Sequence, residues 1–213
     1  NISSKLEINN ASINSKEIKK NNVFFAIKGK NKDGNLFIKE AIIKGASLAI
    51  TNNKKKSKKE IIVKDTLKFL TEASSILREN LPSKIISITG SCGKTSLKEL
   101  TGRSLSKISQ TTYSPKSFNN KFGVPLSLFN LKKNDNFGIF EIGMDKKGEI
   151  DYLSKIIKPD VGVITNISYA HIKNFKNLNQ IALAKSEIIK NIKDDGYLIL
   201  NKDDKFYNFH KKI

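Results

Sequence analysis

A short glycine-rich loop, Gly90-Ser91-Cys92-Gly93-Lys94-Thr95, constrains the fold of this chain more than any other segment. It follows an apolar, β-branched run at 85–89 that is typical of a strand, and it precedes a helical pattern over about 94–107. Glycines let backbone N–H groups turn inward around phosphate oxygens, a lysine reaches the terminal phosphates, and a threonine hydroxyl ligates Mg²⁺. Although the spacing is shorter than the general G-x-x-x-x-G-K-[ST] pattern, the sequence predicts a phosphate-binding loop. We expect its contacts from Gly90, Ser91, Cys92, Gly93, Lys94, Thr95 and Ser96.

The order of predicted strands and helices favours an α/β fold in two domains. Pro82-Ser83 breaks an amphipathic helix, and we place a domain boundary there, with domains at 1–82 and 83–213. Before the break, strands are expected at 23–27, 47–51 and 60–63, and helices at 37–45 and 66–81. After it, strands are expected at 85–89, 137–142, 161–165 and 197–200, and helices at 94–107, 149–157 and 178–192. Apolar strands that alternate with helices predict a mostly parallel sheet with helices on both faces, and ligands at the carboxyl ends of its strands.

The net charge of +19 raises the alternative of a nucleic-acid-binding module. Of the 39 basic residues only Arg78 and Arg103 are arginine, so 37 are lysine, and they are spread along the whole chain. Such a bias is typical of an A/T-rich coding sequence, whereas a nucleic-acid surface more often interleaves arginine with aromatic residues. The densest run, 54–59, is interpreted as a solvated loop. We therefore expect no nucleic-acid partner.

The cysteine and apolar content favour a cytoplasmic protein. Cys92 is the only cysteine, so an internal disulfide is impossible and a reducing compartment fits. The longest apolar runs, such as 23–27, are too short to span a bilayer, so we expect no membrane insertion. Since the chain begins at Asn1 rather than Met, we also expect it to be a piece of a longer protein.

Two further residues, Glu141 and His171, lie where a ligand is expected, at or after the strand ends. Glu141 ends an apolar strand, where a carboxylate is unfavourable unless it meets a cation, either a metal ion or a structural partner. His171 follows the predicted strand at 161–165, but a lone histidine is more often structural, and Mg²⁺ prefers oxygen ligands. Lys185 is one lysine among many, and its residue type alone does not single it out.

Taken in order, these segments resemble the Mur ligase family of ATP-dependent amide-forming enzymes of bacterial cell-wall precursor synthesis. The resemblance runs from about 14 to 204 and includes the loop at 89–96. More specific blocks are Ser117-Phe118-Asn119-Asn120 with 123–126, Glu141-Ile142-Gly143-Met144 with 148–150, Thr165-Asn166-Ile167 with 170–171, Ala184-Lys185-Ser186-Glu187-Ile188, and Asn201 with 203–204. The block at 119–126 favours the members that add D-alanyl-D-alanine to UDP-N-acetylmuramoyl-tripeptide.

The resemblance implies a mechanism and a set of catalytic residues. ATP phosphorylates the terminal carboxylate of the muramoyl-tripeptide, and the amine of D-alanyl-D-alanine attacks the acyl phosphate. Lys94 and two Mg²⁺ ions neutralise the phosphoryl charge. Thr95 and Glu141 hold one ion, His171 serves the second, and Lys185 matches a lysine that relatives carry as a carbamate. A carbamate requires a neutral amine, hence a lowered pKa at a buried site.

The resemblance also implies substrate contacts from residues of both domains. In the first, which resembles a UDP-sugar-binding domain, these are Ser15, Asp33 and Gly34; in the second, they are Asn119, Asn120 and Asn166. Two departures from the family pattern occur in the first domain: Asn14-Ser15-Lys16 stands where relatives have Asp-Ser-Arg, and Asp33-Gly34-Asn35-Leu36 where they have Asp-Gly-His-Asp. Both remove charge or bidentate geometry from the expected UDP site.

Further expectations follow from the family pattern. Relatives continue into the rest of the central domain and a C-terminal domain that brings in the amino substrate, so we expect the central domain here to be truncated, the C-terminal domain to be absent, and this piece to be inactive by itself. The full-length protein is expected to be a monomer. Alternatives that stay open are a family member that adds the third stem-peptide residue and, from another class, the basic nucleic-acid-binding module.

Overall fold

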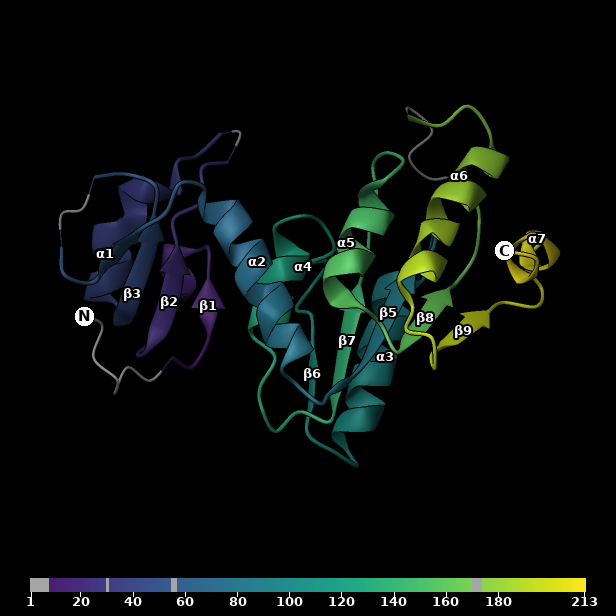
Figure 1. Ribbon diagram of the computed structural model, residues 1–213, viewed down its shortest axis with the longest axis horizontal. Helices are drawn as coiled ribbons and strands as arrows, with labels where there is room; N and C mark the ends of the chain where they lie inside the picture. The colour runs from purple at the N-terminus through teal and green to yellow at the C-terminus, as the bar shows by residue number, and fades with distance from the viewer. Residues whose placement is uncertain (1–7, 30, 55–56, 170–173) are drawn as a thin grey trace. The chain divides into compact units, whose positions relative to one another are not determined.

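The computed structural model describes residues 8–29, 31–54, 57–169 and 174–213. The chain divides into two compact units, 1–76 and 77–213, each with its own sheet (Figure 1). All strand pairings found among the described residues are parallel, so the predicted α/β class is confirmed. The division between the units falls inside helix α2 (Thr66–Glu79), a little before the boundary expected at Pro82. The extent of each functional domain stays a prediction.

The first unit is a four-stranded sheet in the order β1-β2-β3-β4. Its strands are β1 (Ala11–Ser12), β2 (Asn22–Phe25), β3 (Ala46–Thr51) and β4 (Glu60–Ile62). The helical segments η1 (Ser15–Glu17), η2 (Gly34–Phe37) and α1 (Ile38–Ile43) connect the strands. Phe24 packs with α1, whereas Phe25, the next residue, meets Phe69 of α2 with ring centroids 6.5 Å apart. Consecutive strand residues point to opposite faces, so the run Val23-Phe24-Phe25 of β2 is apolar because both faces are covered.

The second unit is a five-stranded sheet in the order β6-β7-β5-β8-β9 (Figure 1). Its strands are β5 (Lys84–Thr89), β6 (Thr111–Tyr113), β7 (Phe137–Glu141), β8 (Val161–Ile164) and β9 (Tyr197–Leu200). The central strand β5 pairs with β7 on one side and β8 on the other. Parallel neighbours end at the same edge, so the loops after β5, β7 and β8 meet.

Helices cover both faces of this second sheet, as expected. On one face, Ile88, Ile139 and Val163 pack with Leu97 and Leu105 of α3. On the other, Ile85, Phe140 and Ile164 belong to a larger core with residues of α4, α5, α6 and η4. The bounds are α3 (Lys94–Ser106), α4 (Gly123–Phe129), α5 (Glu149–Ile157), α6 (Leu178–Lys185), η4 (Ser186–Asn191) and α7 (Tyr207–Lys211).

The sequence-based elements agree with the structure for the longer segments and fail for short ones. The helix expected over 178–192 is an α-helix only to Lys185 and continues as 3₁₀ turns. The 3₁₀ turns begin next to the buried Glu187, whose carboxylate accepts a hydrogen bond from the Gly148 amide at the start of α5. The short elements β1, β6, α4 and α7 were not anticipated. No helix among the described residues is long and apolar enough to cross a membrane.

Candidate functional site

The loop between β5 and α3 has a backbone that requires its two glycines. Gly90 has φ of 144° and Gly93 has φ of 79°, a region that L-residues rarely adopt. A Cβ atom on Gly90 would also lie 1.9 Å from Thr165 Oγ1, whereas one on Gly93 would meet nothing within 4 Å. A side chain at position 90 is therefore excluded both by the backbone conformation and by a steric clash, whereas at position 93 only the backbone conformation disfavours one.

The segment that follows β8 holds this loop in place. The amide of Ser91 donates to Asn166 O at 2.9 Å, and the amide of Cys92 donates to Asn166 Oδ1 at 3.0 Å. In return Thr165 Oγ1 donates to Cys92 O at 2.6 Å. Asn166, expected to contact substrate, thus shapes the loop here, and its role toward substrate stays a prediction.

The first turn of α3 presents a ready site for an anion. Lys94, Thr95 and Ser96 open the helix, where amide groups have no intrahelical acceptor and the helix dipole is positive. Lys94 Nζ folds back on the loop and donates to Gly90 O at 2.8 Å and Ser91 O at 3.2 Å. Backbone amides and a lysine therefore converge at one helix start, which fits a phosphate group.

Glu141 lies at the end of β7, next to this turn, and only 2% of its surface is exposed. It accepts a hydrogen bond from Thr95 Oγ1 at 2.7 Å and another from Asn119 Nδ2 at 2.7 Å. Both partners are uncharged, and none of the ion pairs found among the described residues includes Glu141. A buried carboxylate without a counter-charge is an attractive position for a cation.

The chemistry of Thr95 and Glu141 fits Mg²⁺, which takes hydroxyl and carboxylate oxygens and keeps other positions for phosphate and water. The described part of the chain contains no group of three or more His, Cys, Asp or Glu side chains that could hold a metal. These two residues therefore supply only part of a coordination sphere. His171, expected to serve a second ion, lies outside the described residues.

Lys185 is buried at the end of α6 and shares an acceptor with Lys94. Its Nζ donates to Gly90 O at 2.9 Å, the same carbonyl that Lys94 contacts, and its surface is 1% exposed. Burial, with the positive charge of Lys94 as a second cause, lowers the pKa of Lys185 to about 7. A substantial neutral fraction near pH 7 is what carbamate formation requires. Residue type alone could not have found Lys185, because its position depends on the packing of α6 against the loop.

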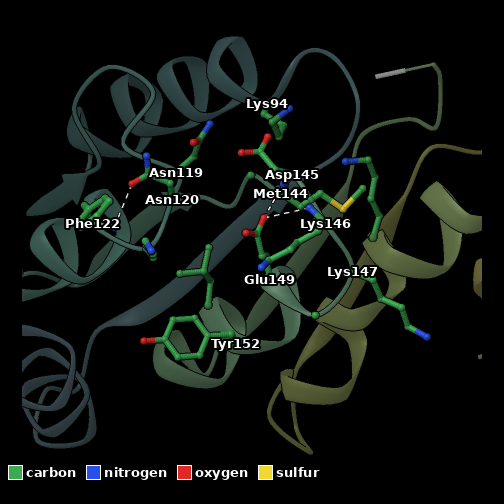
Figure 2. A pocket seen from close by; sticks show the side chains of 15 residues that line it. Lys94, Asn119, Asn120, Phe122, Met144, Asp145, Lys146, Lys147, Glu149 and Tyr152 are labelled. Atoms are coloured by element: carbon green, nitrogen blue, oxygen red, sulfur yellow. Dashed lines mark hydrogen bonds between the residues drawn. The ribbon is translucent and has the colours of Figure 1, made fainter. Parts of the chain in front are cut away.

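A cavity of about 600 Å³ opens beside these residues (Figure 2). Lys94, Asn119, Asn120 and Lys185 line it together with the segment 143–149. The two asparagines differ in role: Asn119 holds Glu141, whereas Asn120 Oδ1 accepts from the amides of Phe122 and Gly123. The structure thus brings Asn119 and Asn120 to the same cavity as Lys94 and Lys185.

Glu187 positions one wall of the cavity, although the residue pattern gave it no role. Its surface is 8% exposed, and its carboxylate accepts from the amide of Gly148 at 2.8 Å and that of Asp151 at 3.1 Å. These amides open α5, where a negative charge is favourable. In the sequence, Glu187 appears only within the family block at 184–188, and the resemblance attaches no role to it.

The remaining candidates lie in the first unit, after adjacent strands. Ser15 follows β1 and donates from Oγ to Glu40 Oε2 at 2.8 Å. Asp33 accepts from the amide of Asn35 at 2.9 Å, a bond that lowers the pKa of its carboxyl. Gly34 is required by close packing, since a Cβ there would lie 2.7 Å from the backbone of Ile27. Their role in substrate binding stays a prediction.

Comparison with known proteins bears on both units. Residues 88–213 match the Mur ligase middle domain, and residues 7–81 match the Mur ligase family, catalytic domain. A UDP-N-acetylmuramoyl-tripeptide--D-alanyl-D-alanine ligase of Buchnera aphidicola is 36% identical over 97% of this chain and 46% of its own length. The crystal structure of MurF from Acinetobacter baumannii superposes with a TM-score of 0.84 at 33% identity, over 96% of this chain and 46% of that one.

A second solved structure is a MurF ligase from Thermotoga maritima in complex with ADP. It has a TM-score of 0.81 at 31% identity and covers 98% of this chain and 48% of that one. The chain spans about half the length of the curated relatives it matches. These matches, over most of the chain, show that it belongs to the Mur ligase family, as its ordered motifs had indicated.

Proposed function

We propose that this chain forms the UDP-muramoyl-peptide-binding and ATP-binding parts of an enzyme that joins D-alanyl-D-alanine to UDP-N-acetylmuramoyl-tripeptide. One observation carries the nucleotide part: Thr95 Oγ1 lies 2.7 Å from Glu141 Oε2, beside a loop whose glycines have φ of 144° and 79°. The relatives that match both units carry this activity in their names, which supports the choice of substrates. ATP and Mg²⁺ are the proposed cofactors.

In this proposal each residue either neutralises charge on the phosphates or holds a ligand in position. The start of α3 and Lys94 bind the phosphates, and Lys94 leaves the carbonyls of Gly90 and Ser91 to do so. Thr95 and Glu141 would hold Mg²⁺, which when bound supplies positive charge to the transferring phosphoryl group. Lys185, as a carbamate, would offer an anionic oxygen ligand to a magnesium ion, and His171 would serve a second ion. The amine then attacks the carbonyl carbon of an acyl phosphate held at near-attack distance, and the amide forms as inorganic phosphate leaves.

A thermal-shift titration of the chain with Mg–ADP tests the nucleotide part. The wild-type chain should be stabilised as ligand is added, because a ligand that binds only the folded state raises its melting temperature. Lys94→Ala should lose most of this shift, whereas Lys133→Ala, which removes an exposed lysine in the loop before β7, should keep it. A Lys94→Ala variant that is stabilised like wild type would refute the assignment of the loop.

The activity itself is tested in the protein as its gene encodes it. With ATP, Mg²⁺, UDP-muramoyl-tripeptide and D-alanyl-D-alanine, product mass and phosphate release should appear together, and Lys94→Ala should abolish both. A product with a single amino acid added in place of the dipeptide would favour a family member that adds the third stem-peptide residue. We further propose that the protein acts in the cytoplasm as a monomer.

The nucleic-acid alternative rests only on the charge of +19 and is tested in the same assay. An oligonucleotide should shift the melting temperature little, and any shift should vanish at higher salt, since contacts to phosphate release counterions. Stabilisation by the oligonucleotide with none from Mg–ADP would favour a binding module instead.

A further inference from the structure

We propose that Lys98 is a positioning residue of the nucleotide site, which ties the segment 114–116 to α3 and so fixes Asn119 and Glu141 relative to Thr95. The inference rests on the proposed function of that site. Lys98 lies one helical turn after Lys94, and its side chain is fully buried, at 0% exposure. Neither the sequence motifs nor the proposed mechanism gives it a task.

Each N–H donor of the Lys98 ammonium has an acceptor. Its Nζ donates to Ser114 O at 2.6 Å and to Lys116 O at 2.5 Å, and it pairs with Glu99 Oε1 at 2.9 Å. An ammonium has three N–H donors, and three acceptors converge on it here. A buried charge is tolerated only when it is paired and hydrogen-bonded in this way. The arrangement is therefore a clamp between α3 and the segment 114–116.

The clamped segment is held in a conformation that it would not adopt by itself. Lys116 has φ of 50°, in the left-handed region that residues other than glycine seldom occupy. Such a conformation persists when surrounding contacts fix it, and the bond from Lys98 to the carbonyl of Lys116 is one of these contacts. Ser114 is anchored as well, since its amide donates to Ile139 O at 3.0 Å and its Oγ accepts from the amide of Glu141 at 3.5 Å.

The segment leads directly to the site. Three residues after Lys116, Asn119 donates from Nδ2 to Glu141 Oε1 at 2.7 Å, and its carbonyl accepts from the amide of Gly143 at 2.8 Å. The other oxygen of Glu141 is held by Thr95, which lies three residues before Lys98 and hence on the same face of α3. Helix α3 thus fixes both oxygens of Glu141, one directly and one through the clamp.

The test compares Lys98→Met with Arg78→Met. Arg78 is a matched control because it is also buried, at 3% exposure, and its guanidinium also holds backbone carbonyls, those of Ile157 and Lys158. It lies in the second unit and does not line the cavity. Both variants should unfold more easily, so a loss of stability alone decides nothing. Two readouts separate positioning from stability: hydrogen exchange at the Gly143 amide and the dissociation constant for Mg–ADP.

In Lys98→Met the Gly143 amide should exchange at least tenfold faster relative to the Val163 amide in β8, and Mg–ADP should bind at least tenfold more weakly. In Arg78→Met the exchange ratio and the dissociation constant should both stay within twofold of wild type. Asn119→Ala should weaken Mg–ADP binding as well, and adding Lys98→Met to it should weaken binding little further, since contacts in one network are not additive.

Unchanged exchange at Gly143 in Lys98→Met, or equal losses in the two methionine variants, would overturn the inference. If Lys98→Met does not fold, Lys98→Gln replaces it, because this side chain keeps two N–H donors but is one bond shorter, and the same changes are expected. If the wild-type chain does not bind Mg–ADP, the proposed function fails, while the exchange at Gly143 still decides whether Lys98 holds the segment.

Discussion

Two buried carboxylates, Glu141 and Asp160, lie at opposite ends of the parallel strands of the second sheet. They differ in whether their partners carry a positive charge. Asp160, just before β8, is 5% exposed and is surrounded by cations: Arg78 at 2.8 Å, Lys193 at 3.0 Å and Lys84 at 3.3 Å. Glu141, at the end of β7, is 2% exposed and accepts from the uncharged groups of Thr95 and Asn119.

The difference separates a structural carboxylate from one that is open to a ligand. Burial raises the pKa of Asp160, but the Ile85 amide, Lys193 and Arg78 together bring the pKa of its carboxyl below the usual value. The fold itself therefore neutralises Asp160. At Glu141 the hydrogen bonds are satisfied but the charge is not, so the proposed Mg²⁺ would supply the missing counter-charge. Its position at the carboxyl ends of the strands and its uncharged partners make Glu141 the candidate for a functional carboxylate.

The largest expected effect is on stability, from Asp160→Asn. This change leaves Arg78 buried without its counter-charge, and breaking a buried pair costs about 3–5 kcal/mol. Urea denaturation should show that loss, while the affinity for Mg–ADP stays within twofold of wild type. Asp194→Asn, at an exposed position, should change neither quantity. A loss below about 1 kcal/mol for Asp160→Asn would show that Asp160 is not a structural carboxylate of the kind described, and the difference from Glu141 would not hold.

Glu141→Gln should give the reverse pattern. Glutamine can still accept from one partner and donate to another, so the free energy of unfolding without ligand should change by less than about 1 kcal/mol. Affinity for Mg–ADP should fall about 100-fold, or about 2.8 kcal/mol, because the carboxylate charge is lost. Isothermal titration with and without Mg²⁺ checks this. An equal affinity in the two proteins would mean that Glu141 is structural after all.

The pH dependence of stability sharpens the comparison through Lys185. Its pKa is about 7 in the folded chain and 10.5 as a model value, so the unfolded state binds the proton more tightly. Burying the protonated ammonium of Lys185 lowers the free energy of unfolding. This loss is complete below pH 7, shrinks as the pH rises toward 10.5, and is absent above 10.5. Wild type should therefore gain about 1.4 kcal/mol per pH unit in this window relative to Lys185→Met, in carbon dioxide-free buffer.

Denaturation at pH 7.5, 8.5 and 9.5 measures this difference, with Lys133→Met as an exposed control that should show none. Addition of bicarbonate labelled with carbon-13 should give a carbamate signal in wild type and none in Lys185→Arg, since a guanidinium cannot form that anion. A difference between wild type and Lys185→Met that does not vary with pH would contradict the lowered pKa of Lys185.

The smallest effect is expected at the loop glycines. Gly93→Ala meets no neighbouring atom but must hold φ of 79°, so it should cost about 1 kcal/mol of stability. Gly90→Ala should cost more, because its Cβ would also collide with Thr165 Oγ1. Paired denaturation curves test the order, and equal losses in the two variants would show that the contact with Thr165 relaxes freely.

Much of the fold could be predicted because its signals are local. The strands at 85–89 and 197–200 and the helix at 149–157 carry strong apolar patterns, and the structure has them within one residue. The three-residue strand β6 was missed because it is too short to show a period, and α4 because Pro125 interrupts its pattern. Pro125 lies in the first turn of α4, where proline is tolerated.

The candidate site was predictable in part. The glycine loop and Glu141 stand at strand ends, which the sequence alone reveals. Lys185 came only from the family resemblance, while Lys98 and Glu187 were given no task, although both side chains are buried and bonded across the site. In sequence, a lysine looks the same whether its ammonium meets water or a backbone carbonyl, and a glutamate looks the same whether its carboxylate meets water or a backbone amide.

By itself, the sequence determined what depends on neighbours along the chain: the alternation of strands and helices, the glycines that turn the loop, and the order of the family motifs. Only the tertiary structure decided which side chains meet. The strand order β6-β7-β5-β8-β9 places β7 beside β5, so Thr95 reaches a carboxylate 46 residues away, and packing of α6 brings Lys185 to a carbonyl 95 residues away. Such contacts form only when the sheet is assembled, because hydrogen-bonded neighbours in a parallel sheet are separated by a crossover connection.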